Sequence, residues 1–273
     1  MGPGPPPAAA VDHADEVVSG VRRRLRTERR RTTDEYEALG AFAERVRALD
    51  PEPGRPTTPG VVSARRQRRS GSALTTVRDA YRATVMSVPH YDEEYGDPYE
   101  RSLAAEFGPE VAIALTEGSA FDRRCEAALL EAIGQARAER EGWIDVLDEE
   151  AESVDRVAGD LRAVADGVAS LSDVADDPDG PDDAGVRDAY ARRLDVLVDR
   201  ADRAVESRLE TVRRHRRAAA GPDAFTPQAF LYRPFDDRHP LLSLAATLRR
   251  CADGVRAALS LPGESESTAP VDT

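Results

Sequence analysis

Apolar residues recur every three or four positions over long parts of the chain, a spacing typical of helices with one buried face. They form such a stripe from Val11 to Leu49, which predicts a long amphipathic helix. Thr32 followed by Glu35 has the pattern of a capping box and predicts that the helix restarts there. Four prolines between Asp50 and Gly60 then end it.

Shorter helices are expected in the next part of the chain. The pattern predicts a second helix from about Ser72 to Val88 and a short acidic loop from His90 to Gly96. Asp97 and Pro98 supply an N-cap and a first-turn proline for a third helix. This helix is expected to break at the Gly108-Pro109 pair and to continue beyond it.

The most regular pattern lies in a helix predicted from about Ser119 to Val174. Eleven positions there are spaced by four and three in strict alternation, and nine of them are apolar. This period of about 3.5 residues predicts a left-handed supercoil against a partner helix, either in the same chain or in another copy. The seam positions are Ala136, Arg140, Trp143, Leu147, Glu150, Val154, Val157, Leu161, Val164, Val168 and Leu171.

The last third of the chain adds two more predicted helices. The stretch from Ala175 to Gly185 is rich in Asp, Pro and Gly and predicts a charged linker. A helix from Val186 to Ala219 follows, then an aromatic loop from Gly221 to His239 and a final helix from Pro240 to Leu261. The alternating β-branched residues that mark strands do not occur in the sequence.

These elements predict an all-α protein, an elongated antiparallel helical bundle with a long coiled-coil arm. The first helix and the helix that carries the seam would form the arm, with the other helices packed at one end. Five segments are expected: a disordered tail (1–10), the helical bundle with its coiled-coil arm (11–174), an acidic linker (175–185), C-terminal helices (186–261) and a second disordered tail (262–273).

The composition indicates a salt-rich setting. The chain contains 51 Asp and Glu and 38 basic residues, all of them Arg, for a net charge of −13, and it contains no Lys and no Asn. An acidic balance alone would also fit an ordinary solvated surface. Arg is weakly hydrated, however, and its exclusive use beside many carboxylates favours a haloarchaeal protein that stays hydrated at molar salt.

The sequence predicts a cytoplasmic protein with no membrane partner. No uncharged apolar run approaches the roughly 18 residues of a membrane span, and Met1 to Ala10 lacks the basic and apolar regions of a signal peptide. Cys125 and Cys251 stand far apart and outside any CxxC spacing, so neither a zinc site nor a disulfide framework is indicated.

Two stretches of the chain carry a family resemblance. They are LTTVRDAYRATVMSVPHYDEEYGDPYERSLAAEFGPEVAIAL, from Leu74 to Leu115, and FLYRPFDDRHPLLSLAATLRR near the C-terminus. Together they resemble an uncharacterised family of haloarchaeal helical, coiled-coil proteins of unknown function, over roughly residues 11 to 261. The resemblance implies a helical, halophilic protein, and it implies no functional residues because the family has no assigned activity.

One short loop holds the side chains that metals prefer. His90, Asp92, Glu93 and Glu94 place an imidazole and three carboxylates together, and such a group could bind a divalent cation. An acidic surface also produces such a group by chance, so we assign no metal-binding residue and expect no cofactor. The Glu-x-x-His pattern of helical di-iron proteins does not occur.

Catalytic motifs are missing from the sequence. It contains no GxSxG, no HExxH and no phosphate-binding GxxxxGK[ST]. We therefore assign no catalytic residue and do not expect an enzyme, although a site dispersed along the chain would leave no motif.

Basic runs leave two functions open. Seven Arg lie between Arg22 and Arg31, and clusters recur at Arg65 to Arg69 and Arg213 to Arg217. They could bind nucleic-acid phosphates, but counterion release weakens such contacts at high salt. The stretch from Glu141 to Asp183 carries fifteen acidic residues and two Arg, so pairing between helices is the simpler explanation.

We expect a structural or protein-interaction protein, a scaffold or adaptor that binds a protein partner or itself through the coiled coil. A nucleic-acid-binding regulator is the alternative.

Overall fold

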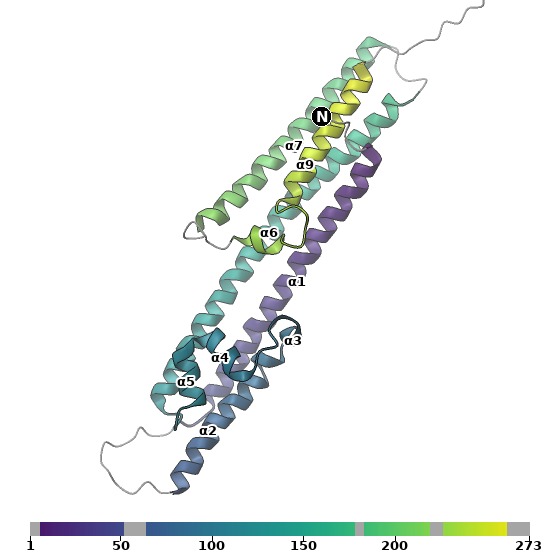
Figure 1. Cartoon of the computed structure of the whole chain (residues 1–273). Helices are drawn as coiled ribbons and strands as arrows, with labels where there is room; N and C mark the ends of the chain where they lie inside the picture. The colour runs from purple at the N-terminus through teal and green to yellow at the C-terminus, as the bar shows by residue number, and fades with distance from the viewer. Residues whose placement is uncertain (1–5, 52–63, 178–182, 219–225, 261–273) are drawn as a thin grey trace, which may run out of the picture. The chain divides into compact units, whose positions relative to one another are not determined.

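The computed structural model describes residues 6–51, 64–177, 183–218 and 226–260. These ranges contain helices and no strand, so the predicted all-α class is confirmed. Figure 1 shows the helices in chain order. They are α1 (Pro7–Arg47), α2 (Ala64–Arg82), the 3-10 helix η1 (Val85–Ser87), α3 (Tyr91–Glu94), α4 (Tyr99–Phe107), α5 (Pro109–Thr116), α6 (Arg123–Ala175), α7 (Ala184–Ala218), α8 (Pro227–Leu231) and α9 (Pro240–Ser260).

The four long helices match the ranges that the apolar stripes predict. They are α1, α6, α7 and α9, and α6 is the helix that carries the seam. The predicted acidic linker falls between α6 and α7, where residues 178–182 lie outside the described residues. Residues 1–5 of the first predicted tail and all of the second, 262–273, lie outside the described residues as well. Residues 7–10 form the start of α1, so this helix begins within the tail that was expected to be disordered.

The chain folds into two compact units. The terminal unit consists of Met1–Arg26 and Asp148–Thr273, and the central unit consists of Thr27–Leu147. Both α1 and α6 contribute to each unit. The other helices divide between the units, α2 to α5 in the central unit and α7 to α9 in the terminal unit. The prediction that all of them pack at one end of the arm is therefore wrong, because the division depends on long-range contacts that local sequence patterns do not contain.

The capping box predicted at Thr32 is wrong, because α1 continues through it. The Thr32 hydroxyl is buried and donates a hydrogen bond of 3.0 Å to the carbonyl oxygen of Glu28, one turn earlier. This bond satisfies the hydroxyl inside the helix, so the side chain does not cap a new helix start. Glu35, the second residue of the pattern, contacts His90 and Arg140 instead.

The second helix ends earlier than predicted. α2 ends at Arg82 rather than near Val88, and η1 follows it. The Thr84 N–H bonds to the carbonyl oxygen of Tyr81 at 3.2 Å, a contact over three residues instead of four. Such bonds tighten the end of a helix into a 3-10 turn.

The start of α4 also differs from the prediction. Its first residue is Tyr99, the preceding Pro98 is extended, and no side chain caps this end. Asp97 is therefore not the cap, and its carboxylate instead forms an ion pair with Arg101, 3.3 Å from Asp97 Oδ1 to Arg101 Nε.

Gly108 joins α4 to α5. Its φ is +84°, a left-handed conformation that residues with a Cβ rarely adopt. Its N–H closes α4 on the carbonyl oxygen of Ala104 at 3.1 Å, and Pro109 begins α5 at a position where no backbone N–H is needed. The break predicted at Gly108-Pro109 is confirmed.

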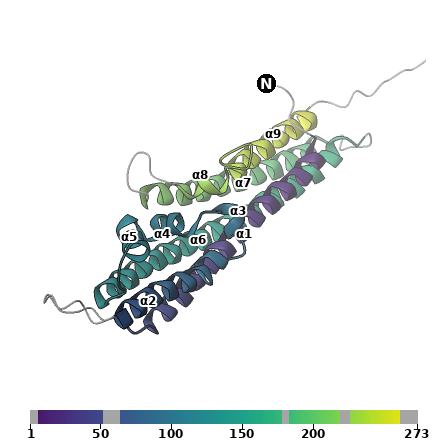
Figure 2. The same cartoon turned by 60° about the horizontal axis from the view of Figure 1, so that its bottom comes forward.

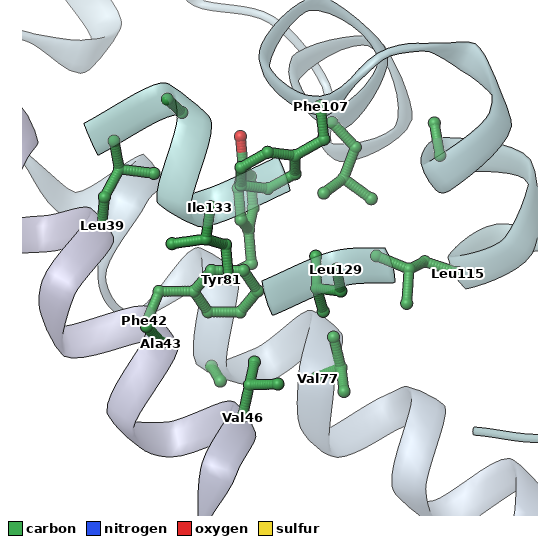
Figure 3. Packing of buried hydrophobic residues seen from close by; sticks show 14 of the residues in the cluster. Leu39, Phe42, Ala43, Val46, Val77, Tyr81, Phe107, Leu115, Leu129 and Ile133 are labelled. Atoms are coloured by element: carbon green, nitrogen blue, oxygen red, sulfur yellow. The ribbon is translucent and has the colours of Figure 1, made fainter. Parts of the chain in front are cut away.

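An aromatic cluster forms the centre of the core in the central unit (Figure 3). Tyr81 of α2 is fully buried and packs edge-on against Phe42 of α1 and Phe107 of α4, with ring centroids 5.3 and 5.8 Å apart. Ile133 of α6 lies beside the same rings in the figure. The Tyr81 hydroxyl lies 2.8 Å from Ser102 Oγ. This hydrogen bond matters because a buried hydroxyl without a partner costs stability.

In the terminal unit, α1 and α6 run antiparallel. Asp15 pairs with Arg162, and Asp155 Oδ1 lies 2.7 Å from the Arg22 Nε. Residue numbers therefore rise along one helix as they fall along the other. The antiparallel pairing expected for these two helices is confirmed within this unit.

α7 and α9 form a second antiparallel pair in the terminal unit, and Figures 1 and 2 show them side by side. Arg249 pairs with Asp202 and Arg256 pairs with Asp195, again with opposite chain directions. The buried face of α9 repeats with helical spacing and consists of Pro240, Leu241, Leu244, Ala245, Leu248, Cys251, Ala252, Val255 and Leu259.

Helices of the same chain bury the seam of α6. Nine of the eleven seam positions are buried, and Arg140 and Trp143 are half-buried. The seam residues from Val154 to Leu171 are at most 2% exposed in the single chain. The predicted burial of the seam is confirmed, and covering these residues requires no second copy.

Candidate functional site

Glu35 of α1 is the centre of a polar cluster in the central unit. Its Oε1 accepts a hydrogen bond of 2.8 Å from the Tyr95 hydroxyl and lies 3.1 Å from His90 Nε2. Its Oε2 accepts a hydrogen bond of 3.2 Å from Arg140 Nε. One carboxylate thereby connects α1, α6 and the segment around α3.

The segment predicted as an acidic loop contains a one-turn helix, α3. Tyr91 is buried, and its hydroxyl donates a hydrogen bond of 3.0 Å to the carbonyl oxygen of Asp97. Gly96 ends the turn with a φ of +56°, and its N–H bonds to the carbonyl oxygen of Tyr91 at 3.0 Å. The sequence did not show this helix because one turn is too short to display an apolar stripe.

Three candidate metal ligands converge at this cluster. A carboxylate oxygen of Glu35, one of Glu94 and an imidazole nitrogen of His90 lie within 4.8 Å of one another. Of the four residues that the sequence singled out, the fold thus groups His90 and Glu94 and adds Glu35 from α1. Asp92 and Glu93 are not part of the group.

Two guanidinium groups already pair with carboxylates of this cluster. Arg31 contacts both Glu93 and Glu94, and Arg140 contacts Glu35. A divalent cation would have to displace Arg31 from Glu94, so the geometry is that of an ion-pair network across the surface of α1.

Arg140 also binds Glu106 of α4, and this pair forms a polar wall. Arg140 Nη2 donates a hydrogen bond of 2.8 Å to Glu106 Oε2. The other oxygen, Oε1, is buried and has no hydrogen-bond partner within the described residues. Burial raises the pKa of Glu106 above its ordinary value of 4.5, and Arg140 opposes that shift only in part.

A cavity of about 230 Å³ adjoins this wall within the central unit. Leu39, Val85 and Val88 give it an apolar side, and Glu106 and Arg140 belong to its polar side. An apolar cavity with a few polar groups on one side is the usual form of a small-molecule site.

A second polar network lies buried inside the terminal unit. Arg208 of α7 binds both carboxylate oxygens of Glu150 on α6, and its Nη1 donates a further hydrogen bond of 3.1 Å to Ser153 Oγ. The Tyr232 hydroxyl donates to Glu150 as well. Burial opposes ionisation of Glu150, but the bonds and charge of Arg208 outweigh it and hold the pKa of this carboxyl below 4.5. The planar guanidinium fits a carboxylate with two parallel bonds.

Gln228 and His215 extend this network. The Gln228 amide donates hydrogen bonds to Glu150 Oε2 at 3.1 Å and to His215 Nδ1 at 2.8 Å. His215 Nε2 lies 3.2 Å from Glu149 Oε2, and because a carboxylate only accepts, this nitrogen carries the proton. Burial lowers the pKa of His215, which agrees with a neutral ring. Each of these buried groups has a partner, as expected of a network that holds helices together.

The sequence contained one clue to both networks. Arg140 and Glu150 are the two seam positions that are not apolar, and a charge at a core position requires a partner. The partners Glu106, Arg208 and Gln228 come from other helices, and no spacing in the sequence connects them.

The described part of the predicted aromatic loop (Gly221 to His239) begins at Thr226, includes α8 and packs within the terminal unit. Tyr232 is buried, and the Arg24 guanidinium lies over the Phe230 ring, 5.2 Å from its centroid. Phe225 lies outside the described residues. Most of the described aromatic surface of this loop is therefore used inside the fold.

Several Arg side chains of the basic runs contact carboxylates of their own unit. The pairs are Arg22 with Asp155, Arg31 with Glu93 and Glu94, and Arg214 with Glu149. Arg23, Arg26 and Arg30 are exposed. The side chains of Arg65 to Arg69 lie outside the described residues.

Two sequence expectations concern the cysteines and membrane spans. Cys125 and Cys251 lie in different units and form no disulfide with each other. In the part of the chain that the structure describes, no helix combines the length and the apolar character needed to cross a membrane.

Comparison with known proteins yields a family and no function. No curated protein and no solved structure matches the chain. A family model, described as a domain of unknown function (DUF7260), matches residues 16–256. This range includes both networks and the cavity, and it agrees with the resemblance to an uncharacterised family. The chain belongs to the DUF7260 family.

Proposed function

We propose that the chain is a structural or protein-interaction module, a scaffold or adaptor built on a coiled-coil pairing of α1 and α6. The observation that carries this proposal is the pairing of charged side chains between helices. Arg22 with Asp155, and Arg162 with Asp15, use basic residues to hold α1 against α6. Basic residues used in this way serve the fold rather than a phosphate backbone.

The burial of the seam indicates that a protein partner would bind to other surfaces of the helices. Because helices of the same chain bury the seam, a protein partner would contact the outside of the helices. The segment around α3 offers such a surface, since Tyr95 is 49% exposed beside the carboxylates of Glu93 and Glu94.

A nucleic-acid-binding regulator is the second candidate. Arg23, Arg26 and Arg30 on α1, with Arg213 near the end of α7, are exposed and could contact phosphates. The net charge of −13 opposes such binding outside these patches. An enzyme with a dispersed site is the third candidate.

We also propose that the protein works in a haloarchaeal cytoplasm. The support is the composition: 51 acidic residues, 38 Arg and no Lys. Weakly hydrated Arg beside many carboxylates suits molar salt, where surface charges are strongly screened.

Changing Arg22, Arg23 and Arg24 together to Ser separates the first two candidates. If the run serves the fold, the variant unfolds at a lower urea concentration than the wild type, and neither protein retards DNA in a mobility-shift assay at high KCl. Arg101, Arg123 and Arg124 changed to Ser provide the control, with the same loss of charge outside the runs. If the wild type binds DNA at high KCl and only the first variant loses this binding, the nucleic-acid-binding regulator replaces the scaffold as the proposed function.

A further inference from the structure

The cavity of the central unit has no role in the proposed scaffold. Five parts of the fold line it: α1, α2, the segment from η1 through α3, α4 and α6. Its volume is about 230 Å³. A buried apolar cavity of about 150 Å³ is already large enough to hold benzene. The space therefore accepts a ring-sized apolar group with a short polar arm, and it is below the roughly 300 Å³ of pockets for larger ligands.

The lining has two chemically different sides. Leu39, Val85 and Val88 supply aliphatic surface, and Leu39 is 1% exposed. The polar side contains Glu35 and Glu106, with Arg140 between them. Two carboxylates share one guanidinium, so this side carries an excess of negative charge.

The carboxylates of Glu35 and Glu106 differ in the number of their hydrogen-bond partners. Glu35 accepts hydrogen bonds from Tyr95 and Arg140 and contacts His90. Glu106 is satisfied at Oε2 by Arg140, whereas its buried Oε1 has no partner among the described residues. A buried acceptor without a partner costs stability, and a ligand that donates a hydrogen bond there recovers it. Burial also raises the pKa of Glu106, and a positive charge beside Oε1 would oppose that shift.

We propose that the cavity binds a small primary amine in its ammonium form. The apolar body lies against Leu39, Val85 and Val88, and the ammonium group donates a hydrogen bond to Glu106 Oε1. A cation is favoured over a neutral donor because it also balances the second carboxylate, and an anion is excluded by the same charge. This inference is independent of the scaffold proposal, since it concerns the interior of the central unit.

Calorimetric titration of the full chain tests the proposal with three probes of one shape: benzylammonium, benzyl alcohol and benzoate. Benzylammonium should bind at least about tenfold more tightly than benzyl alcohol, as expected for a charge-assisted hydrogen bond. Benzoate should not bind. Equal affinity for the three probes, or binding of none of them, would overturn the proposal.

Two variants locate the binding. Glu106→Gln should weaken benzylammonium by about tenfold or more while changing benzyl alcohol little. Glu110→Gln makes the same change at an exposed position of α5 and should leave every affinity unchanged. Unaltered benzylammonium binding in a helical Glu106→Gln protein contradicts the assignment.

Val85→Phe keeps the test decisive if Glu106→Gln does not fold. Val85 is a half-buried lining residue, and a ring at this position occupies the space that the apolar body needs. Benzylammonium should then fail to bind. If benzylammonium binds Val85→Phe as tightly as the wild type, the amine binds elsewhere on the protein and the cavity is not its site.

Discussion

At the scale of single residues, the buried pair of Glu150 and Arg208 constrains the packing of the terminal unit most strongly. Both side chains are at most 3% exposed, and each needs the other because a lone charge in the interior is costly. Ser153, Gln228 and Tyr232 complete the hydrogen bonds of this pair. The network therefore fixes α6, α7 and the segment around α8 in one arrangement.

Arg208→Met should destabilise the protein strongly. It removes the guanidinium and leaves the Glu150 carboxylate buried without its counter-charge, a change that costs about 3–5 kcal/mol in other proteins. The free energy of unfolding in urea, followed by circular dichroism, measures the loss. Arg200→Met is the matched control, because Arg200 and Asp160 form an exposed pair, and exposed pairs contribute only about 0–1 kcal/mol.

The same pair sets a pH dependence. The folded-state pKa of Glu150 is below its ordinary value of 4.5, so ionised Glu150 stabilises the protein above pH 4.5. This contribution is lost as the pH falls from 4.5 through the lower folded-state pKa. Glu150→Gln combined with Arg208→Met should recover part of the lost stability and remove this part of the acid sensitivity. An unchanged acid profile in the double variant would show that Glu150 is not its source.

At the scale of elements, the long helices were predictable because each carries a repeated apolar stripe. The seam of α6 and the break at Gly108-Pro109 follow from spacing and from backbone chemistry that acts locally. The missed features depend on tertiary contacts. Thr32 bonds back into α1 instead of capping it, and Tyr91 holds α3 in place through Asp97.

The candidate site was predictable only in part. The sequence showed His90 and Glu94 as candidate ligands in one loop. Glu35, the third ligand, lies on α1, 55 residues before His90. Arg140 was visible as a charged member of the seam, whereas nothing in the sequence pairs it with Glu106. The cavity arises from side chains of five separate parts of the chain, so local patterns contain no trace of it.

At the scale of the whole molecule, charge should govern stability. The net charge is −13, and fifteen acidic residues lie between Glu141 and Asp183. Unscreened carboxylates repel one another, so helicity and the melting temperature should fall at about 0.1 M KCl and recover toward about 3 M. Circular dichroism over a KCl titration measures both. If neither changes over that range, the composition does not reflect adaptation to salt.

The seam of α6 is closed by helices of the same chain. Leu161 is fully buried at the middle of the five seam residues from Val154 to Val168, and the neighbouring Arg162 side chain is 50% exposed. Leu161→Asp removes a core side chain, which alone costs about 2–5 kcal/mol, and also buries a carboxylate. Arg162→Asp should cost no more than about 1 kcal/mol, because it alters only exposed pairs.

Urea unfolding of the wild type and these two variants, at two protein concentrations about 100-fold apart, tests this claim most directly. We predict a large loss of stability in Leu161→Asp, a small one in Arg162→Asp and midpoints that do not depend on protein concentration. Variants that unfold alike would show that the seam is misassigned, and a wild-type midpoint that rises with concentration would show that another copy of the chain closes it.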